Sequence, residues 1–460
     1  MTRARSSRSL PILPLLFCCW LAGCAVPAVD GAIDGRGTAP QTVVGTRGPL
    51  SAARSKAIIA KLGAHSDLLQ LHLAIEQEVS GAPLSVGNRT HLLVDGPATF
   101  RAMFAAIRSA KRNVYLEYYI FENVESDGVH LVDLLTEKAR AGVSVAVIYD
   151  SYGSVDTPQA VFDALRAAGV TLLEFHPVNP LKAQHGYSLN DRDHRKILAV
   201  DGQTAIVGGV NLYTAYQPHP HRRLVASGGP NPETWHDTDL EIDGTAAAEL
   251  QRVFLAHWAA QQGPPLPAVA LADPVAAGNE AVRIIASDHN DTIPRYYATM
   301  LSAIRNAEKT IWITTAYFVP TDDELHDLAA AAARGVDVRL MLPGKSDSDL
   351  ALAVGHSEYG PLLKAGVKIY ELQDGMLHSK SAVIDGVWSV VGSSNFDHRS
   401  ILFNDEVDAV VLGRDTARQL EALFAKDEAT ARSVTLQEWN DRPIGERLRE
   451  IYSHAVEALL

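Results

Sequence analysis

The feature that most constrains the fold of this chain is an internal repeat. The stretch "FRAMFAAIRSAKRNVYLEYYIF" at residues 100–121 corresponds to "YYATMLSAIRNAEKTIWITTAYF" at residues 296–318. Further along, "EKARAGVSVAVIYD" corresponds to "AAAARGVDVRLMLP", and "LRAAGVTLLEF" to "LLKAGVKIYEL". Each unit is typical of a helix followed by a short apolar strand. Because these units occur twice in the same order, the sequence predicts an α/β fold of two similar halves, each a mixed β-sheet flanked by helices.

The chain of 460 residues is long enough for two such halves that share an interface. Stretches rich in Gly, Pro and Ala separate the repeated units from the N-terminus and from each other, as is typical of tethers and linkers. We therefore predict a signal segment at 1–23, a flexible tether at 24–50, a first half at 51–262, a linker at 263–280, a second half at 281–431 and a C-terminal helical extension at 432–460.

One short motif closes the repeat in each half: "HRKILAVDG" at residues 194–202 and "HSKSAVIDG" at residues 378–386. Each reads as a strand that ends in an Asp-Gly hairpin turn, in which both central residues need a positive φ. The histidine and the lysine lie two positions apart and share a face of the strand. We therefore predict that the His-Lys pairs carry out the chemistry, namely His194, Lys196, His378 and Lys380. The aspartates of the turns, Asp201 and Asp385, are predicted to have a structural role.

The returning strands, "TAIVGGVN" and "WSVVGSSN", end in Asn211 and Asn395. We expect each amide to lie near the His-Lys pair of its own half. If the halves pack face to face, two ammonium groups and two amides can bind one phosphate. One neutral imidazole can then attack phosphorus, while a protonated imidazole gives its proton to the leaving oxygen. The duplication therefore predicts a single active site at the interface of the halves.

Composition restricts the partners of the chain. A hydrophobic content of 47% and a charged content of 21% are ordinary for a globular protein, and the net charge is −13. This acidic balance argues against a nucleic-acid partner, which usually requires a basic surface. Lysine is not a usual metal ligand, and no group of His, Asp and Glu has ligand spacing along the sequence, so we expect neither a metal nor another cofactor.

The N-terminus has the pattern of a secretory signal, because three arginines precede the apolar run "LPILPLLFCCWLAGC". Its end, "LAGC" at residues 21–24, resembles a bacterial lipobox, which implies cleavage before Cys24 and lipid attachment to that cysteine. A plain signal peptide or an uncleaved anchor is the alternative. Cleavage would remove the three arginines and change the net charge from −13 to −16. Ala25 after the cysteine implies sorting to the outer membrane, facing the periplasm.

The residues quoted above resemble the phospholipase D superfamily, whose hallmark is a duplicated His-x-Lys-x4-Asp motif. Within it, the stretches "VYLEYYIF", "WHDTDLEIDG", "TAYFVP" and "FNDEV" are most similar to bacterial cardiolipin synthases. The resemblance implies that His194 attacks a phosphodiester, forming a phosphatidyl-histidine, and that His378 acts as general acid and then as base. It also implies that the lysines and asparagines hold the phosphate.

The same resemblance implies that an acidic residue orients each histidine. Glu406 occupies that position in the second half, and so is predicted to partner His378. Asp237 aligns with it in the first half. Ser393 has no hydroxyl counterpart in the first half, where Gly209 stands, and is predicted to contact the phosphate.

Transfer of a phosphatidyl group from phosphatidylglycerol to a second phospholipid, forming cardiolipin, is the function that this resemblance favours. The alternative is a phospholipase D that uses water as the acceptor. A nuclease of the superfamily ranks third because of the acidic charge. A non-catalytic lipid-binding lipoprotein would have broken motifs, and both motifs are intact. Phospholipids are therefore the expected partners.

Overall fold

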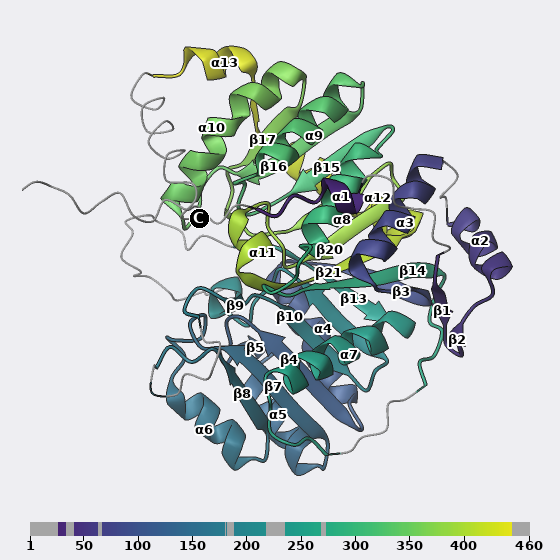
Figure 1. Cartoon of the computed structure of the whole chain (residues 1–460). Helices are drawn as coiled ribbons and strands as arrows, with labels where there is room; N and C mark the ends of the chain where they lie inside the picture. Colours follow the sequence, from purple (N-terminus) through teal and green to yellow (C-terminus); the bar gives the residue numbers. More distant parts are fainter. Residues whose placement is uncertain are drawn as a thin grey trace, which may run out of the picture.

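The computed structural model describes residues 26–33, 41–62, 67–179, 181, 188–217, 235–267 and 273–443. Its two α/β halves are stacked one above the other (Figure 1). The predicted signal segment with Cys24 lies outside the described residues, as do residues 444–460 of the C-terminal extension. Among the helices that are described, none combines the length and the apolar composition needed to cross a bilayer.

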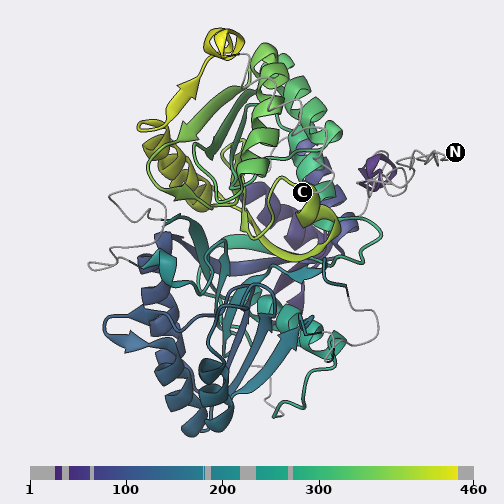
Figure 2. The same ribbon diagram turned by 90° about the vertical axis from the view of Figure 1, so that its left-hand side faces the viewer.

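The first half is built on a seven-stranded mixed sheet. Strands β4, β7 and β8 are parallel to one another, and the remaining neighbours are antiparallel. Helices α4, α5 and α6 pack on one face of this sheet and α7 on the other (Figure 2). The order across the sheet is β8 (Thr171–Phe175), β7 (Ser144–Asp150), β4 (Asn113–Tyr118), β10 (Lys196–Val200), β11 (Thr204–Gly208), β13 (Thr238–Asp243) and β3 (Leu84–Val94), and the helices are α4 (Asp95–Ser109), α5 (Leu131–Arg140), α6 (Gln159–Ala167) and α7 (Thr245–Ala260).

The second half repeats this order, which confirms the predicted duplication. Its sheet carries one additional edge strand, β22 (Arg432–Val434), within the segment for which a helical extension was predicted. The order is β22, β17 (Lys368–Leu372), β16 (Asp337–Pro343), β15 (Thr310–Thr314), β19 (Ser381–Ile384), β20 (Trp388–Gly392), β21 (Asn404–Leu412) and β14 (Glu280–Ser287), and the helices are α8 (Arg295–Arg305), α9 (Asp322–Ala333), α10 (Asp349–Ala365), α11 (His398–Leu402), α12 (Arg414–Glu428) and α13 (Leu436–Asp441).

Strand β3 joins the two sheets into one. Its residues 89–94 pair with β13 of the first half, and its residues 85, 86 and 88 pair with β14 of the second. The two halves also share an apolar core, which includes Phe254 of α7 and Leu420 of α12. The halves therefore cannot slide past each other without breaking backbone hydrogen bonds, and their interface is a fixed place for a shared site.

The helices before β3 pack on the second half, although the predicted boundary at residue 51 assigned them to the first. Helix α3 (Asp67–Ser80) follows α2 (Ala52–Lys61) and contributes Leu69 and Leu73 to the core of the second half. The carboxylate of Glu76, fully buried, accepts from Nη1 of Arg283 at 2.7 Å and from Nε1 of Trp388 at 2.9 Å.

Candidate active site

Each motif forms the hairpin that the sequence predicts, β10–β11 in one half and β19–β20 in the other. The turn residues Asp201 and Asp385 have φ of 55° and 54°. The Asp201 carboxylate accepts from the backbone N–H groups of residues 111–113 at 2.9, 2.9 and 2.8 Å. The Asp385 carboxylate accepts from those of residues 308–310 at 2.9, 2.7 and 2.9 Å. Each carboxylate thus ties its turn to the start of the neighbouring strand, β4 or β15, and the structural role of the aspartates stays a prediction.

The two histidines are held by carboxylates of the opposite halves. Nδ1 of His194 lies 3.0 Å from both carboxylate oxygens of Glu406. Nδ1 of His378 lies 2.7 Å from Oδ2 of Asp237. The prediction that Glu406 partners His378 is therefore wrong. Both acids do contact a histidine, but the pairing is crossed between the halves.

Two short parallel strand pairs produce this crossing. Strand β9 (Arg192–Asp193) of the first half pairs with the start of β21 in the second, and the N–H of His194 donates to the carbonyl of Asp405 at 2.9 Å. Strand β12 (Trp235–His236) pairs with β18 (Met376–Leu377), and the N–H of His378 donates to the carbonyl of His236 at 2.8 Å. Each half thus places its histidine beside the acidic strand of the other.

Hydroxyl groups fix the two carboxylates, and here the halves differ. Ser393, which is fully buried, donates its hydroxyl to Glu406. The contact of Ser393 with the phosphate stays a prediction. In the first half the equivalent donor is Tyr216, whose hydroxyl lies 2.7 Å from Oδ2 of Asp237. A Cβ on Gly209 would lie 2.1 Å from the Asp237 carboxylate, which explains why no serine stands there.

A second pair of buried acids, Asp239 and Asp408, supports the asparagine loops. Asp239 accepts from the N–H of Val210 at 3.1 Å, and Asp408 accepts from the hydroxyl of Ser394 at 2.6 Å. Burial raises the pKa of both, that of Asp408 to about 8. Sequence reasoning missed these residues. The available signal was an acid two positions after Asp237 and again two positions after Glu406.

The histidines open into one cavity of about 300 Å³ at the interface of the halves, as predicted. The rings of Tyr119 and Trp235 lie 5.3 Å from His194 and 5.1 Å from His378, respectively. The Oδ1 atom of Asn395 is buried and has no hydrogen-bond partner within the described chain, so it is available to a ligand. The polar wall of the cavity includes His194, His378, Asn211, Asn395, Arg192 and Arg399.

Both motif lysines are buried beside their own histidines. Nζ of Lys196 donates to the carbonyl of His194 at 2.5 Å, and Nζ of Lys380 lies 2.9 Å from Nδ1 of His378. Burial lowers the pKa of Lys196 to about 7 and that of Lys380 to about 8, although nearby carboxylates oppose the shift. An anionic ligand in the cavity would favour the charged ammonium form of each.

The four groups at the centre of the site have different pKa shifts. Burial and the two lysines lower the pKa of both histidines, that of His194 well below its ordinary value. Burial opposes ionisation of Asp237, but His378, Lys380 and the hydroxyl of Tyr216 together outweigh it and lower the pKa of that carboxyl. For Glu406 burial prevails and raises the pKa to about 7. His378 therefore faces the stronger acid.

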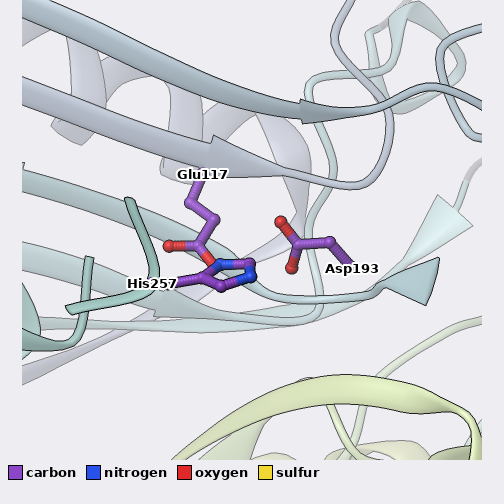
Figure 3. Close-up of side chains that lie close together, drawn as sticks. All are labelled: Glu117, Asp193 and His257. Atoms are coloured by element: carbon purple, nitrogen blue, oxygen red, sulfur yellow. The ribbon is translucent and has the colours of Figure 1, made fainter. Parts of the chain in front are cut away.

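The fold also brings together a group of residues that was not predicted from the sequence: Glu117 of β4, Asp193 of β9 and His257 of α7 (Figure 3). Their potential ligand atoms lie within 4.8 Å of one another. However, Nδ1 of His257 lies 2.7 Å from Glu117, and its Nε2 lies 3.3 Å from Asp405. Arg195 also reaches Glu117 at 3.4 Å. With both ring nitrogens facing carboxylates and a guanidinium alongside, the group functions as an ion-pair network rather than as a metal site.

Duplicated His-Lys hairpins that share one cavity define an enzyme of the phospholipase D type. A family model described as "Cardiolipin synthase, PLD-like domain" matches residues 103–217 and 300–428. The chain belongs to this family of phosphatidyltransferases.

Curated relatives agree with this assignment. The cardiolipin synthase of Geobacillus kaustophilus is 35% identical over 397 residues, which cover 84% of this chain and 76% of that protein. The cardiolipin synthase of Alkalihalophilus pseudofirmus is 32% identical over 405 residues, covering 87% and 78%. Among solved structures, phosphatidylserine synthase of Haemophilus influenzae has the same fold, with a TM-score of 0.59 at 13% identity over 84% of this chain and 99% of that one.

Proposed function

We propose that the enzyme transfers a phosphatidyl group from phosphatidylglycerol to the free hydroxyl of a second phospholipid and so forms cardiolipin through a phosphatidyl-histidine. The observation that carries this proposal is the crossed pairing. Two histidines line one cavity, and each has Nδ1 on a buried carboxylate, which leaves Nε2 as its reactive nitrogen.

The electrostatics support His194 as the nucleophile. An attacking imidazole must be neutral, and the pKa of His194 is lowered well below its ordinary value. His378 faces Asp237, whose lowered pKa keeps it ionised and able to stabilise an imidazolium. Burial and the lysines lower the pKa of His378, and an anionic phosphodiester in the cavity would oppose this shift and favour the acid form of His378.

The reaction then balances in two steps. Nε2 of His194 attacks phosphorus, the bond from phosphorus to the glycerol oxygen breaks, and His378 gives its proton to that oxygen. His378 next removes a proton from the hydroxyl of the second lipid, whose oxygen attacks phosphorus and breaks the P–N bond. Lys196 and Lys380, with Asn211 and Asn395, would hold the phosphate oxygens throughout.

A product assay tests the proposal. Purified enzyme with vesicles of phosphatidylglycerol is expected to release glycerol and form cardiolipin without added metal. Formation of phosphatidic acid alone would assign the enzyme as a hydrolase instead. His194→Ala and His378→Ala are each expected to abolish turnover. Quenching with alkaline detergent, which preserves a P–N bond, should trap a phosphatidyl adduct on the His378→Ala chain but not on the His194→Ala chain, and the reverse result would exchange the two roles.

The proposal includes attachment to the bacterial cell envelope through an acylated Cys24. The lipobox-like "LAGC" supports this attachment, and Ala25 supports an outer-membrane location facing the periplasm. A tether of this kind raises the local concentration of enzyme at its substrate. Labelled palmitate should enter the wild-type chain, and a Cys24→Ser chain that still incorporates label would refute the attachment. Fractionation of the two membranes tests the location.

A further inference from the structure

We propose that two loops beside the cavity form a membrane-docking patch, which inserts apolar side chains into a phospholipid bilayer and holds the cavity against the lipid surface. The docking patch consists of Tyr152, Val155 and Leu189. This proposal rests on the proposed function, because it specifies how the active site reaches a lipid that is packed in a bilayer.

The docking patch presents three large apolar side chains to the solvent. Tyr152, Val155 and Leu189 are 58%, 60% and 65% exposed. Within the part of the chain that the structure describes, seven large hydrophobic residues are exposed, and four of them, including Leu181, lie in the two segments that follow β7 and β8. Single exposed apolar residues are ordinary. A group of them beside an active site marks an interaction surface.

Hydrogen bonds attach the first of these segments to the wall of the cavity. The hydroxyl of Ser154 donates to the carbonyl of Tyr119 at 3.1 Å. Gly153 lies so close that a Cβ there would be 2.3 Å from the same carbonyl oxygen. Tyr119 lines the cavity, and its ring packs against His194. Gly153 and Ser154 therefore anchor this turn to the site. Tyr152 and Val155 are the residues immediately before and after them.

The turn is fixed in shape before it meets a membrane. The carboxylate of Asp150 accepts from the N–H groups of Tyr152 and Gly153 at 2.8 and 2.9 Å. The hydroxyl of Ser151 accepts from the N–H of Val178 at 3.1 Å, which joins the loop after β7 to the loop after β8. Backbone groups that are already paired can approach a bilayer without the cost of unsatisfied polar groups.

Leu189 extends the docking patch toward Arg399 in the wall of the cavity. Its neighbour Asn190 accepts from Arg399 at 2.9 Å through its side chain and at 3.1 Å through its carbonyl. Arg399 and Arg192 line the cavity. The chain as a whole carries a net charge of −13, which repels an anionic bilayer. Local insertion of apolar groups beside the guanidinium group of Arg399 is the contact that overcomes this repulsion.

A fluorescence experiment on the full chain tests the docking patch. Cys18, Cys19 and Cys24 are replaced by serine, and an environment-sensitive dye is attached through Val155→Cys or, as the control, Val275→Cys. Val275 is 67% exposed, and its N–H is bound to Gln203 in the turn at the opposite end of the β10–β11 hairpin. Vesicles of phosphatidylglycerol should shift the emission to the blue at position 155 only. Water-like emission at both positions would overturn the proposal.

Turnover separates failure of docking from failure of the proposed function. The double variant Tyr152→Ser/Val155→Ser should lower turnover of phosphatidylglycerol in vesicles about tenfold, equivalent to about 1.4 kcal/mol. It should leave turnover of a dissolved short-chain phosphatidylglycerol unchanged, and Val275→Ser should affect neither. An equal loss on both substrates would overturn the docking patch. A wild-type enzyme that uses neither substrate would refute the proposed function, while the emission shift would still decide docking.

Discussion

Substitution of Asp385 separates a role in folding from a role in catalysis. Its carboxylate accepts three backbone N–H groups, with Oδ1 accepting those of Lys309 and Thr310 and Oδ2 that of Glu308. Hydrogen bonds to a charged group contribute about 1.5–3 kcal/mol each when buried. Residues 308 and 309 are exposed, so water can bind their N–H groups once the carboxylate is removed. This hydration offsets much of the lost stability. The three bonds together then contribute about 2 kcal/mol.

The backbone adds a second contribution. Asp385 has a φ of 54°, a conformation that alanine adopts at a cost of about 1–2 kcal/mol and that asparagine tolerates. Asp385→Ala should therefore lower the free energy of unfolding by about 3 kcal/mol. Asp385→Asn keeps the oxygen that accepts two of the three bonds and should cost about 1 kcal/mol. Urea titration of both variants measures these values.

Activity provides the decisive comparison. The catalytic rate per folded molecule should stay within about twofold of the wild type for Asp385→Asn, because the turn lies at the end of the hairpin away from His378. An Asp385→Asn enzyme with wild-type stability but with the inactivity of His378→Ala would refute the structural role. Asp201→Asn is the matched variant in the first half and should behave in the same way.

Three further predictions concern the supports of the site. Tyr216→Phe removes the hydroxyl that donates to Asp237 and should lower kcat about tenfold without unfolding the protein; an unchanged kcat would remove Tyr216 from the site. Burial raises the pKa of Asp408 from 3.8 to about 8, so the wild type should lose stability as the pH rises from about 4 to about 8, because the unfolded carboxyl ionises first. In Asp408→Asn melting curves this loss should be smaller but not absent, because the pKa values of Asp239 and Glu406 remain raised, and an unchanged slope would contradict the assignment. Gly392→Ala places a methyl group 1.9 Å from Oδ1 of Asp408. Like other substitutions that overpack a core, it should lower the free energy of unfolding by several kcal/mol. A urea titration that shows no change in stability would contradict the close packing.

The repeated halves and the hairpins could be predicted from the sequence because their signals are local. An Asp-Gly pair fixes the turn, and His378 and Lys380 follow from the period of a strand. The partner of each histidine could not be predicted in this way. His194 lies 212 positions from Glu406, and the strand pair that joins them is only two residues long. No periodicity marks so short a strand.

The same reason explains the other differences between sequence and structure. Helix α3 has the pattern of an amphipathic helix, but its pattern does not say which half it covers. The group of Glu117, Asp193 and His257 comes from three elements that lie far apart in the sequence. Alignment of Ser393 with Gly209 showed that a hydroxyl was missing from one half. Only the structure shows that Tyr216, from a different position in the chain, supplies it.

The crossed pairs also determine how such a chain can change over generations. A substitution at Glu406 removes the partner of His194, and a substitution at Asp237 removes the partner of His378. The sequences of the two repeats therefore cannot change independently after duplication. An ancestor with a single repeat would have had a complete site only as a symmetric pair of copies. In the fused chain, a variant without His194 and a variant without His378 each inactivate the same single site. Coexpression of two such variants should therefore restore activity only if repeats are exchanged between molecules.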